Sequence, residues 1–149
     1  MTSRSHQCDS IEALDTWLSS VVSDDFVPTL AIAFMGVKFD IASVQKTFRK
    51  HDVALFGASS WGEFTEGDIQ DGTIAVLLLD LDAGSFDIRL DHFEGGDEAS
   101  VTTGVAKYAQ EQFDNPFFMV LTANLQTDME AVLKVFESTI GPKVELAGA

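Results

Sequence analysis

Hydrophobic positions along the chain follow two periods that alternate between short breaks. Residues 11–22 place apolar side chains at the spacing of a helix, with Asp9 as the predicted N-cap. Residues 30–35 and 53–56 are instead unbroken apolar runs of strand length. Between them, Asp40 begins a second predicted helix. Two strands joined by a helix form a βαβ unit, so we expect these strands to be parallel.

The second half of the chain continues this alternation and adds a predicted hairpin. Residues 73–81 read as a long buried strand, and residues 86–91 alternate apolar and charged side chains, as an antiparallel strand with one wet face does. The order predicted for the whole chain is α-β-α-β-β-β-α-β-α-β. This is an α/β fold with a mixed β-sheet, parallel βαβ units, an inserted antiparallel hairpin and helices packed on the sheet. We find no internal repeat. The remaining predicted elements are helices at 97–113 and 127–140, the second opened by Thr127 and Glu130, and strands at 117–122 and 144–146.

The polar start of the chain and its apolar end differ in character. Residues 1–9 read as a flexible leader whose single cysteine, Cys8, is a spectator thiol, and residues 10–149 read as one α/β domain. A strand pattern that runs into Ala149 predicts that the domain is truncated at its C-terminus. Exposed strand edges tend to pair, so we expect a homodimer or concentration-dependent self-association.

Composition and charge exclude several classes of function. Of 149 residues, 46% are hydrophobic, and 24 acidic against 9 basic residues give a net charge of −15. Such a field repels phosphate backbones and anionic lipid heads, so we expect neither a nucleic-acid nor a membrane partner. One cysteine and three scattered histidines offer no metal-ligand spacing, and we expect no metal and no cofactor. No signal peptide or membrane-length apolar run is present, which predicts a cytoplasmic protein.

The segment GASSWGE, residues 57–63, is the most distinctive candidate for chemistry. It follows an apolar strand, at the edge where open α/β sheets bind ligands. Its small residues let a ligand approach the backbone, Ser59 and Ser60 supply hydroxyls, and Glu63 supplies a charge suited to an ammonium group. A tight turn capped by the serines explains the same residues. The segment also resembles a nucleophile elbow centred on Ser60, although that motif requires a helix directly afterwards.

The same segment, with the acidic turn and the strand that follow it, resembles the FIST N-terminal domain, a sensory module of signal-transduction proteins. The resemblance implies a non-catalytic domain that binds an amino acid or a related metabolite and acts on a signalling protein. The family often carries cysteine where this chain has Ala58, and aspartate where it has Asn124, so a reactive group and a charge are missing here. Further segments that fit the family are 31–35 with Asp40, 73–79, 121–124 and 146–149.

We therefore expect a small-ligand-binding sensory module that uses Ser59, Ser60, Trp61, Glu63 and Asn124. Two alternatives stay open at this stage. A serine hydrolase would use Ser60 as its nucleophile. A protein-interaction scaffold would use the strand predicted at residues 86–91, which has one solvent-exposed face.

Overall fold

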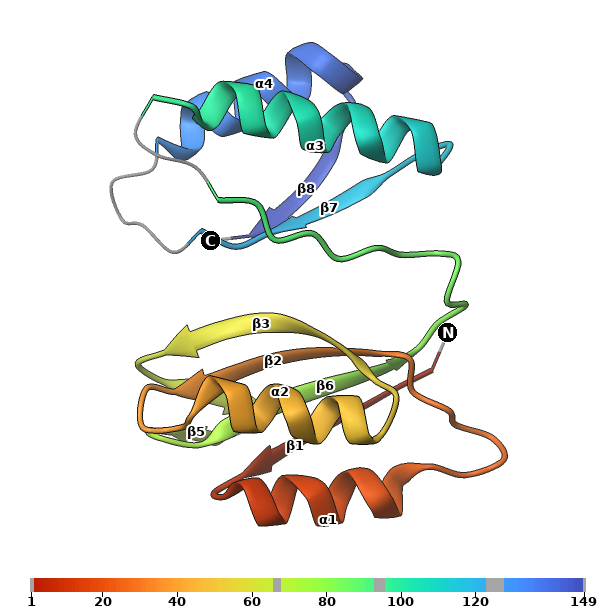
Figure 1. The fold of residues 1–149 in the computed structure, drawn as a ribbon, viewed down its shortest axis with the longest axis vertical. Coiled ribbons are helices and arrows are strands. Elements are labelled where there is room, and N and C mark those ends of the chain that lie inside the picture. The colour runs from red at the N-terminus through yellow and green to blue at the C-terminus, as the bar shows by residue number, and fades with distance from the viewer. Residues whose placement is uncertain (1, 66–67, 93–95, 123–127, 149) are drawn as a thin grey trace. The chain divides into compact units, whose positions relative to one another are not determined.

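The computed structural model describes residues 2–65, 68–92, 96–122 and 128–148, which form two compact units, Met1–Phe86 and Asp87–Ala149 (Figure 1). The first unit contains β1 (Thr2–Cys8), α1 (Ile11–Val21), β2 (Leu30–Gly36), α2 (Ile41–Lys50), β3 (Ala54–Ser60), β4 (Glu63–Thr65), β5 (Asp68–Gln70) and β6 (Ile74–Asp80). The second contains α3 (Glu98–Gln112), β7 (Phe117–Val120), α4 (Met129–Ile140) and β8 (Glu145–Gly148).

The first unit is built on a four-stranded sheet with the strand order β1-β6-β2-β3. The strands β2 and β3 are parallel, with Leu30 opposite Ala54, whereas β6 runs antiparallel to both β1 and β2. The short strands β4 and β5 form a separate hairpin. The prediction of an α/β fold with a mixed sheet is confirmed.

Helices α1 and α2 lie on the same face of this sheet (Figure 1). Alternate residues of β2 face them, because successive side chains of a strand point to opposite sides. Asp40 is the N-cap of α2, as predicted, and its side chain accepts a hydrogen bond from the amide of Ser43. The buried core joins three side chains of β2 to the helices and consists chiefly of Ala31, Ala33, Met35, Leu14, Leu18, Val44, Phe48, Ile74 and Leu78.

The polar start of the chain forms a strand instead of a flexible leader. Residues Thr2–Cys8 make β1, which pairs antiparallel with β6 from Thr2 opposite Asp80 to Cys8 opposite Ile74. Without β1, that edge of β6 would leave its backbone groups unpaired, and a strand supplies the missing hydrogen bonds whatever its side chains are. The N-cap of the first helix is Ser10, whose side chain accepts from the amide of Ala13, and not the predicted Asp9.

The second unit packs α3 and α4 on the parallel pair β7 and β8 (Figure 1). Its core consists of Ala106, Ala109, Phe118, Val132 and Phe136. Residues 86–91, predicted as an antiparallel strand, have no strand structure. Side chains hold this segment on α3 instead. The Tyr108 hydroxyl donates a hydrogen bond to Asp87, and the Arg89 guanidinium lies 4.9 Å from the centroid of the Tyr108 ring.

The two units repeat one arrangement, which the sequence analysis missed. Both follow the order helix, strand, helix, strand, and in both the two strands are parallel. The second helix of each begins at a capping aspartate, Asp40 or Asp128, and buries a valine four residues later and a phenylalanine eight residues later. The buried pairs are Val44 with Phe48 and Val132 with Phe136.

A glycine occupies the same place in both parallel pairs. Gly57 lies opposite Ala33, and Gly148 lies opposite Val120, each at the fourth position of its pair. A Cβ atom on Gly57 would lie 1.8 Å from the carbonyl oxygen of Ala33, and one on Gly148 would lie 1.9 Å from that of Val120. Both positions therefore exclude every other residue, for the same steric reason.

Candidate functional site

The candidate segment lies mostly within a strand, not in a loop. The parallel pairing of β3 with β2 continues through Ser59 opposite Met35 and Ser60 opposite Gly36. The carboxyl ends of both strands therefore meet at one edge of the sheet, which is the edge where α/β sheets hold ligands. Ser59 is exposed and Ser60 is half-buried.

Glu63 is enclosed behind Ser60, and its carboxylate is bonded on both oxygens. The Ser60 hydroxyl donates to Oε1 at 2.6 Å, and the Thr73 amide donates to Oε2 at 2.9 Å. Only 1% of the Glu63 residue is exposed to solvent. A ligand at this edge meets the serines before it meets the carboxylate, so direct contact with Glu63 stays a prediction.

The Glu63 carboxyl is held in its ionised form. Burial raises its pKa, but hydrogen bonds from the Ser60 hydroxyl and from the amides of Thr73 and Gly72 outweigh burial and lower the pKa below 4.5. No Lys or Arg among the described residues forms an ion pair with it. A negative charge, solvated by neutral donors alone, therefore lies directly behind Ser60.

Of the other two predicted site residues, the structure describes Trp61 but not Asn124. Trp61 follows β3 and is 88% exposed, so its ring is available to solvent. Asn124, predicted to contribute from a neighbouring strand end, lies outside the described residues. The structure thus brings Ser60 and Glu63 into contact, whereas Ser59 and Trp61 are neighbours of Ser60 in the chain only.

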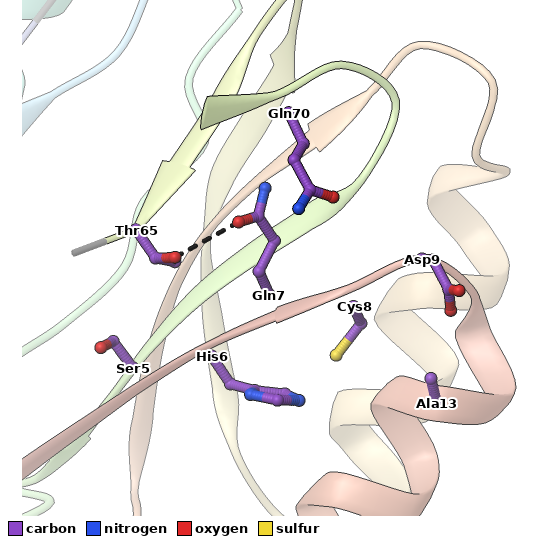
Figure 2. A pocket seen from close by; sticks show the side chains of 8 residues that line it. All are labelled: Ser5, His6, Gln7, Cys8, Asp9, Ala13, Thr65 and Gln70. Atoms are coloured by element: carbon purple, nitrogen blue, oxygen red, sulfur yellow. Dashed lines mark hydrogen bonds between the residues drawn. The ribbon is translucent and has the colours of Figure 1, made fainter. Parts of the chain in front are cut away.

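A contribution that the sequence analysis missed comes from Gln7 on β1. Its amide nitrogen donates to the Thr73 hydroxyl at 2.7 Å and to the Glu63 carbonyl at 3.4 Å, and its amide oxygen accepts from the Thr65 hydroxyl at 3.2 Å. Figure 2 shows the bond between Gln7 and Thr65. Gln7 therefore ties β1 to the strand that carries Glu63, a role hidden while residues 1–9 read as a leader.

Gln7 also lines an open pocket of about 630 Å³ along β1 (Figure 2). The remaining walls come from the start of α1 and from the β4–β5 hairpin, through Ala13, Thr65 and Gln70. Hydrogen bonds connect this pocket to the end of β3 through Gln7, Thr73 and Glu63. The carboxyl end of β3 and the β1 edge thus share one polar network.

The geometry around Ser60 does not fit a nucleophile elbow. A strand, β4, follows instead of the helix that this motif requires. The Ser60 hydroxyl donates to a carboxylate whose pKa is lowered, which makes that group a weak general base. His51 is bonded to Asp15 and His6 stacks on Trp17, so neither histidine is placed to activate Ser60.

No group of three or more His, Cys, Asp or Glu side chains is placed to hold a metal ion in the described part of the chain. No described helix is both long and apolar enough to cross a membrane.

Residues 29–149 match the family model of the FIST N domain, which covers parts of both units. The chain belongs to the FIST N domain family. The matched region includes the carboxyl ends of β2 and β3 and the strand β6, whereas β1 and α1 precede it. No curated protein matches the chain. FIST domains are sensory modules of signal transduction and are generally non-catalytic, which makes this chain a sensory signal-transduction module.

Proposed function

We propose that this FIST domain senses a small amine-bearing molecule, an amino acid or a related metabolite, at the carboxyl ends of β2 and β3. The observation that carries the proposal is the bond from Ser60 to the buried Glu63 carboxylate. The ligand would bind on Ser59, Ser60 and Trp61, with Glu63 acting behind them. Asn124 is proposed as a further contact.

Ser60 favours a ligand that donates hydrogen bonds. Its hydroxyl proton is committed to Glu63 Oε1, so the lone pairs of its oxygen are left to accept from a ligand N–H. The ionised carboxylate behind it adds a negative potential, and no described Lys or Arg forms an ion pair with it. An ammonium group can donate to the Ser60 oxygen and is attracted by the negative potential. A phosphate group has no proton to donate there in its ionised form and is repelled by the same potential.

Trp61 supplies the second element of recognition. Its ring is 88% exposed immediately after the strand that carries the serines. An ammonium group over an indole face gains about 0.5–1 kcal/mol at an exposed site. Burial of this ring under a ligand would also stabilise the bound state. A sensor transmits its signal when the ligand binds one of its conformations more tightly than the other.

The proposal is tested by calorimetric titration with a panel of free amino acids, polyamines and phosphorylated metabolites. We expect hits among the amines only. Trp61→Ala should weaken binding about threefold, because it removes the cation–π contact. Leu90→Ala is the matched control, since Leu90 is 100% exposed and lies outside the site, and it should bind like the wild type.

Ser60→Ala separates binding from folding in the same experiment. This variant loses an acceptor for the ligand, so its affinity should fall more than that of Trp61→Ala, while circular dichroism reports whether the fold is kept. Hits confined to phosphorylated compounds, or equal binding by all four proteins, would overturn the proposal. Ester hydrolysis by the wild type above the level of Ser60→Ala would favour the hydrolase instead.

A further inference from the structure

In the first unit, a cationic side chain of β1 lies at the C-terminal end of α1. The Arg4 guanidinium donates to the carbonyl oxygen of Val21, the last residue of α1, at 3.1 Å. The same guanidinium lies 4.6 Å from the ring centroid of Phe26, which is 1% exposed. Arg4 thus neutralises a helix end and stacks on an aromatic ring in one place.

The second unit has the ring but not the cation. Phe113 precedes the first residue of β7 by four positions, as Phe26 precedes the first residue of β2. It is half-buried, and no Lys or Arg among the described residues lies over its ring. Phe113 lines a pocket of about 910 Å³ between the ends of α3 and α4 and the starts of β7 and β8.

The electrostatics of this pocket favour a positive charge. The ends of α1 and α2 have cations, from Arg4 and from the basic residues of the last turn of α2, but the last turns of α3 and α4 contain none. Asp114 and Glu145 line the pocket and form no ion pair with the described residues. One basic side chain, Lys143, opposes these two carboxylates and two negative helix ends.

We propose that this pocket binds a guanidinium- or ammonium-bearing small molecule, which takes the place that Arg4 takes in the first unit. The cation would stack on Phe113 near the carboxylate of Asp114. Its apolar stem would lie against Pro116, Ile140 and Pro142, which also line the pocket. This site is distinct from the carboxyl end of β3, because its residues all belong to the second unit.

The probe for the test is n-propylguanidinium, with butyrate as an anion of similar size, and the readout is the amide chemical shifts of the full chain. We expect saturable shifts for residues 110–117 and 140–145 with the cation and none with butyrate. Phe113→Leu keeps an apolar side chain but removes the ring, and should weaken binding about fivefold. Gln110→Arg should supply the missing cation from the chain and abolish the shifts.

Two carboxylate variants give a matched comparison. Asp114→Asn should weaken binding. Asp97→Asn, at the opposite end of α3, removes the same single negative charge from the protein and should leave binding unchanged. Ser60→Ala should also leave it unchanged, which separates this site from the function proposed above. No saturable shifts up to roughly 10 mM cation, equal shifts with butyrate, or equal weakening by Asp97→Asn would overturn the assignment.

Discussion

The hydroxyl of Ser60 donates a 2.6 Å hydrogen bond to Glu63, three residues later in the chain. The same carboxylate accepts from the amide of Thr73, directly before β6. Glu63 therefore joins the carboxyl end of β3 to the start of β6 and orients the hydroxyl that faces the proposed ligand. Any displacement of Ser60 by a ligand would act on β6 through two hydrogen bonds.

Glu63→Gln should destabilise the fold. An amide places a donor where the carboxylate oxygens accept from Ser60 and Thr73, so we expect a loss of about 1.5–3 kcal/mol, as for hydrogen bonds to a charged group. Urea denaturation at neutral pH measures it. Glu111→Gln, which removes an exposed carboxylate on α3, should change the free energy of unfolding little.

The effect of Glu63→Gln should depend on pH. The folded state lowers the pKa of Glu63 below 4.5, so its charge stabilises the fold fully above that pH and less as the pH falls through the folded pKa. The difference between wild type and variant should therefore shrink in acid. A difference that grows below pH 4.5 would contradict the assignment of an ionised buried carboxylate.

Gly57→Ala should be among the most damaging single substitutions in the first unit. Its Cβ would lie 1.8 Å from the carbonyl oxygen of Ala33, so the backbone pairing must shift, and we expect a loss of more than about 3 kcal/mol. Gly104→Ala is the matched control within α3, where nothing lies within 4 Å. It should stabilise the protein by about 0.5–1 kcal/mol, because alanine favours a helix.

The carboxyl of Asp15 should titrate below its usual range. Hydrogen bonds from Lys50 and His51 at the end of α2 lower its pKa from 3.8. Lys50→Met should raise the pKa toward that value, as measured by carboxyl NMR shifts against pH. Lys46→Met, on the same helix, should leave the Asp15 titration unchanged.

The thiol of Cys8 should resist alkylation in the folded protein. Cys8 is 2% exposed, and burial and the nearby Asp9 carboxylate raise its pKa to about 11. Because the thiolate is the reacting form, iodoacetamide should label Cys8 far faster in urea than in native buffer. Equal rates in the two conditions would show that β1 does not hold Cys8 in the core.

Strong local patterns predicted most of the elements. The apolar run at β2, the aspartate that caps α2 and the long strand β6 each carry their own signal, and all are present within a residue or two. The predictions for residues 2–8, a flexible leader, and for residues 86–91, an antiparallel strand, were wrong. In both segments the side-chain pattern does not reveal the tertiary contacts. Residues 2–8 pair with the edge of β6, and residues 86–91 lie against α3 through Asp87 and Arg89.

The sequence by itself determined the α/β class, the parallel pair β2 and β3, and the FIST resemblance, because periodicity and short motifs are local. Only the tertiary structure decided that Glu63 is buried and bonded, that Gln7 reaches it across 56 residues, and that the two units repeat. The residues that the two units share are single and widely spaced: a capping aspartate, a valine, a phenylalanine and a glycine. Strand register and burial, which exist only once the chain has folded, show that these residues occupy matching places.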